Sequence, residues 1–207
     1  MAIASGALLV SCSQGNTETS NETAEATETA ETTEVAESAT WTVNTDESNV
    51  RWEGGTAGAM VYSHFGSIKI KSGSVTTDGG AISGGTFEID MTTINPEDDG
   101  YSEDHPASDL VGHLSTPDFF NTAEFPTASF TVKSMDGNTI TGDLTIRGNT
   151  NEETIALESM EIAEGNMSAT GTLVFDRQKY DVAWAHYMED VILSDDITLN
   201  ITLVAAM

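Results

Sequence analysis

Four histidines are the side chains of this 207-residue sequence best suited to acid–base or metal chemistry at neutral pH. His64, His105, His113 and His186 are widely separated, and none forms a compact metal-binding motif such as His-x-x-x-His. A metal-dependent enzyme would need at least two of His64, His113 and His186 to meet in the fold, and this is one hypothesis. His113 is interpreted first as a structural hydrogen-bonding group beside Asp109 or Asp118, with a polar contact at the mouth of the expected barrel as its alternative role.

Other catalytic signatures are missing from the sequence. It has no Gly-x-Ser-x-Gly nucleophile motif and no phosphate-binding loop. Carboxylates are so numerous that no pair of them stands out as an acid and a base. We therefore expect a protein that is not an enzyme and that needs no cofactor.

The single cysteine, Cys12, closes a short apolar run that ends Leu9-Val10-Ser11-Cys12. This run resembles the lipobox of bacterial lipoproteins, in which the peptidase cuts before the cysteine and the thiol is lipidated. Residues 1–12 are thus expected to be a lipoprotein-type signal segment, although no Lys or Arg precedes the apolar run. An ordinary signal peptide or a buried cysteine is the alternative. Lipidation would tie the protein to a membrane of the bacterial cell envelope, facing the periplasm or the exterior.

The composition is strongly acidic, with 34 Asp and Glu against 7 Lys and Arg and a formal net charge of -27. Nucleic acid is excluded as a partner because binding its phosphates requires a basic surface. Seven of the acidic residues lie in residues 13–40, where Glu recurs about every third residue among Thr, Ala, Ser and Asn and no basic residue occurs. This segment has almost nothing apolar to bury, so it is predicted to be a disordered linker.

From Trp41 onward the apolar residues recur with a period of two, which is typical of strands that have one buried and one solvated face. The clearest case is the alternation from Ile197 to Leu203, and the same pattern occurs at 68–71, 87–91, 129–133, 140–147 and 173–175. Turn-forming sequences separate the runs, at 78–80, 83–85, 136–138 and 164–166. Two irregular stretches, 96–124 and 177–190, interrupt the pattern, and Thr116-Pro117-Asp118 has the residue types that begin a helix.

About eight strands of this kind, each with one apolar face, must form a sandwich or close into a barrel. We expect an all-β fold for residues 41–207, an antiparallel eight-stranded β-barrel with one or two short helical insertions. Barrels of this size hold one small ligand or are filled by side chains.

Several motifs of the barrel region resemble the YceI-like family over about Trp41 to Ala205. The resemblance is carried by the segments 41–52, 112–130, 141–150 and 175–182, of which the block made of 112–121 and 124–130 is the most distinctive. The sequence differs from many members in two places: Asn151-Glu152-Glu153 stands where they have Thr-Lys-Pro, and Asp181 stands where they have Gly. The resemblance implies a lipocalin-like barrel in the periplasm or outside the cell that holds a long apolar molecule, such as a polyisoprenoid, a quinone or a fatty-acyl compound.

Ligand-binding candidates are the inward-facing apolar and aromatic residues, because a hydrophobic tube binds a chain by removing both surfaces from water. Each of them could equally pack a filled core. The candidates are Trp52, Phe65, Ile68, Ile70, Phe87, Ile89, Phe119, Phe120, Phe130, Val132, Leu144, Ile146, Leu157, Phe175, Tyr180, Trp184 and Leu199.

Three hypotheses follow for the function. The first is a carrier or sequestering protein for a long apolar ligand, which predicts an elongated apolar cavity. The second is a packed barrel displayed on a lipid-anchored stalk as a structural or protein-interaction module, and the third is the metal-dependent enzyme. A homodimer is compatible with each of them.

Overall fold

A computed structural model describes residues 38–58, 62–185 and 191–207 of the chain. The expected signal segment at 1–12 with Cys12, and nearly all of the expected linker at 13–40, lie outside these residues. His186 also lies outside them. The expectations for those segments therefore stay predictions.

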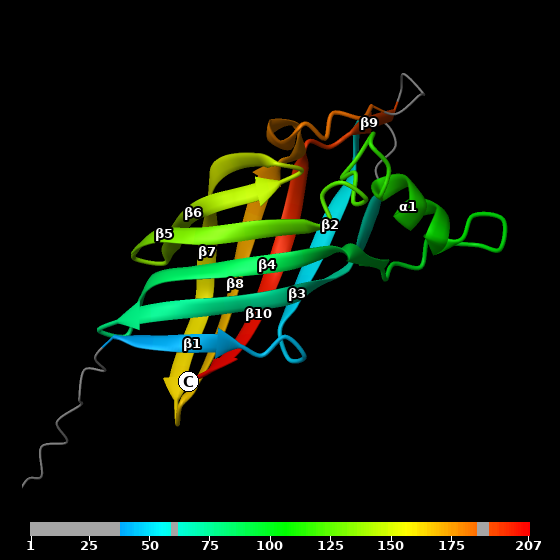
Figure 1. The fold of residues 1–207 in the computed structure, drawn as a ribbon. Helices are drawn as coiled ribbons and strands as arrows, with labels where there is room; N and C mark the ends of the chain where they lie inside the picture. The colour runs from blue at the N-terminus through cyan, green and yellow to red at the C-terminus, as the bar shows by residue number, and fades with distance from the viewer. Residues whose placement is uncertain (1–37, 59–61, 186–190) are drawn as a thin grey trace, which may run out of the picture. The chain divides into compact units, whose positions relative to one another are not determined.

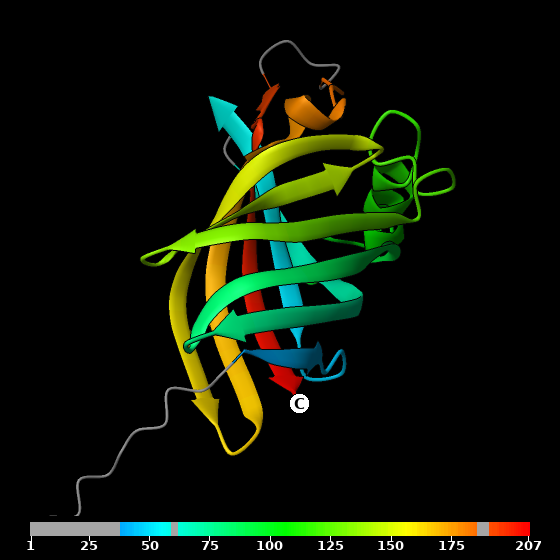
Figure 2. The ribbon, with the colours of Figure 1, turned by 60° about the vertical axis from the view of Figure 1, so that its left-hand side comes forward.

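Eight antiparallel strands form a closed barrel, which confirms the predicted fold class (Figures 1 and 2). Each strand pairs with the next, and β10 closes the ring because it pairs with β8 on one side and with β2 on the other. At the closure Leu199 lies opposite both Leu173 and Trp52. The strands are β2 (Asn49–Gly58), β3 (Ser63–Asp78), β4 (Ala81–Pro96), β5 (Thr127–Asp136), β6 (Thr139–Ile146), β7 (Asn149–Ala163), β8 (Asn166–Asp176) and β10 (Asp196–Ala206).

The period-two pattern of the sequence corresponds to the inside and outside of this barrel. In β6, Ile140, Leu144 and Ile146 are buried, whereas the threonines between them are partly exposed. Closure satisfies the backbone donors and acceptors that an open sheet would leave at its edges, so the apolar faces can all point to one interior.

Tight turns join neighbouring strands at one end of the barrel, called here the base. The two-residue turns Gly79-Gly80 and Glu164-Gly165 have positive φ at both positions, the geometry of a type I′ hairpin. The turn expected at 83–85 is wrong. Ser83 lies inside β4 at a register shift between the pairs Thr76–Gly84 and Thr77–Ile82, which is a β-bulge.

The base is covered by the short strand β1 (Ala39–Val43), which pairs with β3 and with the end of β10 (Figure 1). Trp41 is almost fully buried there, and its indole Nε1 donates a hydrogen bond of 3.0 Å to Oγ1 of Thr77. Val43 and Met167, also at this end of the barrel, are buried as well. The base is therefore packed with side chains.

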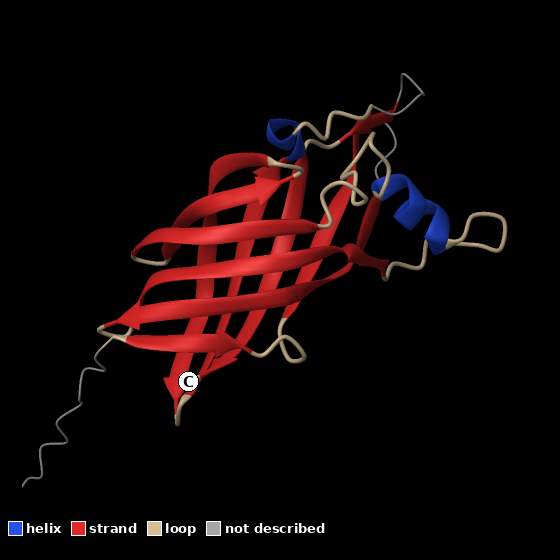
Figure 3. Ribbon diagram, in the orientation of Figure 1, coloured by secondary structure: helices blue, strands red, loops and turns tan. Residues whose placement is uncertain are grey.

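The opposite end, called here the mouth, carries the helical elements and one short additional strand (Figure 3). These are the helix α1 (Ala107–Leu114), the 3₁₀ turn η1 (Arg177–Tyr180) and the short strand β9 (Val191–Leu193), which pairs with β2. The helix expected to begin at Thr116 is wrong, because the helix lies upstream and Thr116–Phe120 form turns that follow it. Asp181 ends η1 with a left-handed φ of 60°, a conformation that glycine adopts most readily.

Candidate functional site

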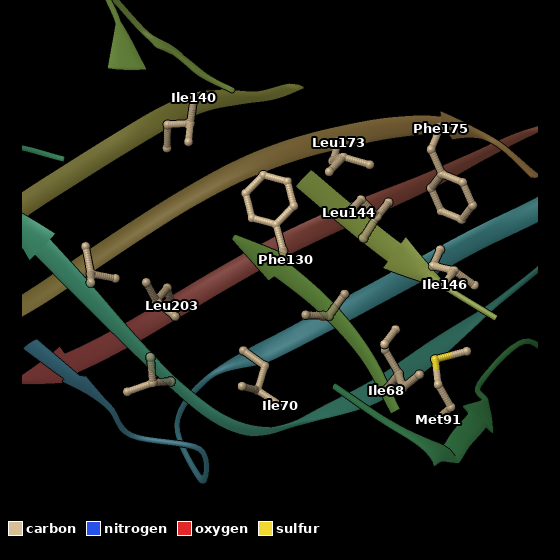
Figure 4. Close-up of a cluster of buried hydrophobic side chains, with 14 of the residues drawn as sticks. Ile68, Ile70, Met91, Phe130, Ile140, Leu144, Ile146, Leu173, Phe175 and Leu203 are labelled. Atoms are coloured by element: carbon tan, nitrogen blue, oxygen red, sulfur yellow. The ribbon is translucent and has the colours of Figure 1, made fainter. Parts of the chain in front are cut away.

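The barrel encloses a cavity of about 490 Å³ that extends from the mouth toward the base. Its wall consists almost wholly of apolar side chains from the inner faces of the eight barrel strands, together with residues of α1 and of the mouth loops. Figure 4 shows part of this wall, where Ile70, Phe130, Leu144 and Leu173 come from different strands and point toward one another. A volume of this size lies within the range of small-molecule sites in proteins.

Fifteen of the seventeen candidate residues lie in the wall of this cavity. The structure brings them together from all eight barrel strands and the mouth loops, although their positions span nearly 150 residues of sequence. They are Trp52, Ile68, Ile70, Phe87, Ile89, Phe119, Phe120, Phe130, Val132, Leu144, Ile146, Leu157, Phe175, Trp184 and Leu199.

Phe65 and Tyr180 lie elsewhere. Phe65 is three residues before Ile68, so it faces the outside of β3, where the guanidinium carbon of Arg51 lies 4.2 Å from the centre of its ring. The alternation itself predicts this orientation, since Ile68 and Ile70 face inward. Tyr180 is fully buried, but in η1, where it packs edge-on against Phe175 with ring centres 5.4 Å apart.

Several wall residues were not among the candidates. Some obey the same alternation and could have been found from it: Val50, Ile140, Leu173, Ile197, Ile201 and Leu203. Others come from the irregular segments, where no periodicity marks the inward face: Leu110, His113, Leu114, Arg177 and Val182.

Aromatic rings surround the cavity at the mouth. The ring of His113, on α1, meets Trp184 edge-on at 4.7 Å and Phe119 at 4.9 Å between ring centres. Phe119 also contacts Trp184 at 5.6 Å. Arg147, in the β6–β7 turn, donates a hydrogen bond of 2.9 Å to the carbonyl of Phe119 and thereby connects this loop to the barrel. His113 thus contributes an aromatic surface to the mouth.

Arg177 organises the other side of the mouth. Its side chain is almost fully buried and donates hydrogen bonds to the carbonyls of Val182, Trp184 and Ser194, at 2.6, 3.0 and 3.0 Å. Its Nη2 also pairs with Oδ1 of Asp195 at 2.9 Å. Burial lowers the pKa of the guanidinium, and the carboxylates of Asp195 and Asp176 oppose that effect.

A polar cluster lies beside the cavity at the start of β3. Asp98 accepts three hydrogen bonds: from His64 Nδ1 at 2.9 Å, from the Tyr101 hydroxyl at 2.9 Å and from the backbone N–H of Phe65 at 3.2 Å. Burial would raise the pKa of the Asp98 carboxyl, but these three donors together lower it. Asp98 is therefore a carboxylate at neutral pH, and its side chain is only 8% exposed.

In the described part of the chain, no three His, Cys, Asp or Glu side chains are grouped so that they could hold a metal ion. His64 is engaged with Asp98, and His113 with aromatic rings. None of the helices in that part of the chain is both long and apolar enough to span a lipid bilayer.

A closed antiparallel barrel with an apolar interior cavity defines the class of hydrophobic-ligand-binding barrels. A family model described as "YceI-like domain" matches residues 41–205, and the chain therefore belongs to the YceI-like family. Members of this family are barrels that bind hydrophobic small molecules.

Similar proteins include a UPF0312 protein from a bovine strain of Staphylococcus aureus, which is 38% identical over 93 residues. The match covers 41% of this chain and 54% of that protein, so the chain spans about half the length of the curated relatives it matches.

Among solved structures, Burkholderia cenocepacia BcnA is similar with a TM-score of 0.61 and 19% identity, over 79% of this chain and 99% of BcnA. A YceI protein from Campylobacter jejuni aligns with a TM-score of 0.46 and 21% identity, over 61% of this chain and 73% of that protein. The likeness to BcnA supports the shared barrel fold.

Proposed function

We propose that this protein binds a long apolar molecule of the polyisoprenoid, quinone or fatty-acyl type inside its barrel, and carries or sequesters it in the bacterial cell envelope. The observation that carries the proposal is the apolar cavity of about 490 Å³. A barrel that served only as a packed interaction module would have its interior filled by side chains.

The energy for binding comes from the apolar wall. Burial of each CH₂ group contributes about 0.8 kcal/mol, so about ten such groups supply roughly 8 kcal/mol before the costs of association are subtracted. Few polar groups interrupt the wall, and those near the mouth, such as His64 and His113, lie where the head of an elongated ligand would rest. This arrangement favours binding over catalysis, because the wall residues that the structure describes are almost all apolar.

Native mass spectrometry of the chain purified from a bacterial host, combined with organic extraction, tests the proposal. We expect a bound mass that extracts as a long-chain lipid or prenyl compound. An unliganded protein that also fails to take up added quinones and fatty-acyl chains would contradict the proposal and favour an interaction module.

The proposed place of action rests on Cys12 and its apolar run. In a host that processes lipoproteins, the chain is expected to incorporate radiolabelled fatty acid and to partition with membranes. The substitution Cys12→Ser removes the thiol that receives the lipid, and the label should disappear. Equal labelling of both proteins would show that Cys12 is not the lipidated residue.

A further inference from the structure

His64 lies between two neighbouring hollows at the mouth. It is part of the cavity wall and also borders a second, more polar pocket with Tyr62, Asp98, Tyr101 and Asp109. Its side chain is 29% exposed, whereas that of its partner Asp98 is 8% exposed. His64 is thus a polar group with access to the end of an otherwise apolar tube.

The hydrogen bonds determine which nitrogen of His64 carries the proton. Asp98 is a carboxylate and can only accept hydrogen bonds. Tyr101 donates its own hydroxyl proton to Oδ1 of Asp98, and both burial and the nearby carboxylate raise the pKa of Tyr101, so it stays protonated. His64 Nδ1, 2.9 Å from Oδ2 of Asp98, must therefore be the protonated nitrogen of the neutral ring.

The other ring nitrogen is then an acceptor. A neutral imidazole protonated at Nδ1 has a free lone pair at Nε2. In the part of the chain that the structure describes, Nε2 of His64 has no hydrogen-bond partner. A ligand head that donates a hydrogen bond would satisfy this acceptor.

The charges around His64 disfavour an anionic head. The residues described as bordering the second pocket include the carboxylates of Asp98, Asp99 and Asp109 but no lysine or arginine. An incoming carboxylate or phosphate would meet these like charges in a partly desolvated site. An uncharged head escapes this repulsion.

We propose that His64, held by Asp98 and Tyr101, binds the polar head of the ligand, and that this head is an uncharged hydroxyl group. The hydroxyl donates a hydrogen bond to Nε2 of His64 while the attached chain occupies the apolar cavity. Isoprenoid alcohols and prenylated hydroquinones share this chemistry. The inference rests on the proposed function, because it assigns the head group of the same ligand.

Matched ligands test the assignment on the delipidated full chain, with binding followed by fluorescence of the cavity tryptophans Trp52 and Trp184. The probes are geranylgeraniol, its methyl ether, geranylgeranoic acid and geranylgeranyl monophosphate. A prenylated hydroquinone and its dimethyl ether form the second arm. Each ether keeps the chain and removes only the donated proton.

The wild-type chain is expected to bind at least one hydroxyl compound about three- to tenfold more tightly than its ether, and more tightly than the acid and the phosphate. The arm with the larger preference identifies the alcohol or the hydroquinone as the better ligand. In His64→Phe, which keeps an aromatic ring but loses the acceptor, the preference should vanish while ether affinity changes less than about twofold. Retained ether binding shows that this variant is folded.

Three results would overturn the head-group site: equal affinity for hydroxyl compounds and ethers in the wild type, a preference that survives in His64→Phe, or tighter binding of the acid or the phosphate. These results leave the cavity's role intact, because the ligands still bind. If no member of either series binds the wild type, the head-group site is overturned; if added fatty-acyl chains also fail to bind, the proposed function fails with it.

Discussion

The hydroxyl of Tyr180, in η1, donates a hydrogen bond of 3.2 Å to Oε1 of Glu153, in β7. Both side chains are buried, and Lys179 Nζ lies 3.1 Å from the same carboxylate oxygen. Burial and the charge of Glu153 raise the pKa of Tyr180, so the hydroxyl remains a donor. Glu153 lies on the inward face of β7, the same face as the cavity-wall residues Ile155 and Leu157. Its hydrogen bond with Tyr180 connects η1 to the barrel.

Removing that donor is expected to destabilise the fold. The substitution Tyr180→Phe keeps the buried ring but leaves the Glu153 carboxylate with fewer donors, which should lower the free energy of unfolding by about 1–2 kcal/mol. Urea unfolding followed by circular dichroism measures the change. Val174→Thr on the exposed outer face of β8 is the control, with an expected change within about 0.5 kcal/mol. Equal effects of the two substitutions would show that the hydrogen bond contributes no stability.

Asp98 makes the stability of the mouth depend on pH. Its pKa in the folded protein lies below the value of about 3.9 for an unfolded chain. The ionised carboxylate therefore stabilises the fold above that value, and this contribution is lost as the pH falls through the lower, folded pKa. Asp98→Asn removes the contribution, so the stability difference from wild type should be largest near neutral pH and shrink below about pH 4.

Urea unfolding over a series of pH values measures this difference. Asp104→Asn, an exposed carboxylate in the same loop, is the matched control. A difference between wild type and Asp98→Asn that does not change with pH would contradict the argument.

Ala169 is a small side chain in the wall of the cavity, near the base. It lies on the inner face of β8, opposite Leu203 of β10 and Met160 of β7. The substitution Ala169→Phe should place a ring in the cavity and shorten the longest chain that binds, with at least a tenfold loss of affinity for the longest ligands and little loss for shorter ones.

Titration with a series of isoprenoid alcohols or acyl chains of increasing length measures the cut-off. Ala156→Phe adds the same ring to the exposed outer face of β7 and should leave the cut-off unchanged. If the two variants bind the series alike, the chain does not reach Ala169.

Arg177 is expected to slow the release of a bound ligand from the cavity. Arg177→Lys cannot reach the three carbonyls and Asp195 at once, because an ammonium lacks the fork of a guanidinium. Unpaired carbonyls at the mouth should lower stability by about 2–3 kcal/mol and speed ligand release. Stopped-flow displacement measures the release rate. Arg51→Lys, at a partly exposed pair with Glu53 outside the barrel, should change stability by less than about 1 kcal/mol and leave release unchanged.

Regular alternation made the barrel and most of its wall predictable. Ile68, Leu144 and Leu199 lie inside because a period of two assigns alternate residues to opposite faces of a strand. The same rule, applied strictly, would have excluded Phe65 and included Leu173. In the irregular segments the period-two rule carries no information. The helix was therefore expected to begin at Thr116, whereas the structure has it at Ala107–Leu114.

The amino-acid sequence by itself determined the closed antiparallel barrel, its strand faces and its membership of the YceI-like family, because all three depend on local patterns and motifs. Only the tertiary structure decided that the inward side chains surround a cavity. The volume they leave depends on the radius of the barrel and on how side chains from eight strands meet, which no single strand specifies. The tertiary structure also decided that His64 contacts Asp98, 34 positions away, and that Arg177 contacts Asp195, 18 positions away. Both contacts involve loop segments without periodicity, so no sequence pattern predicts them.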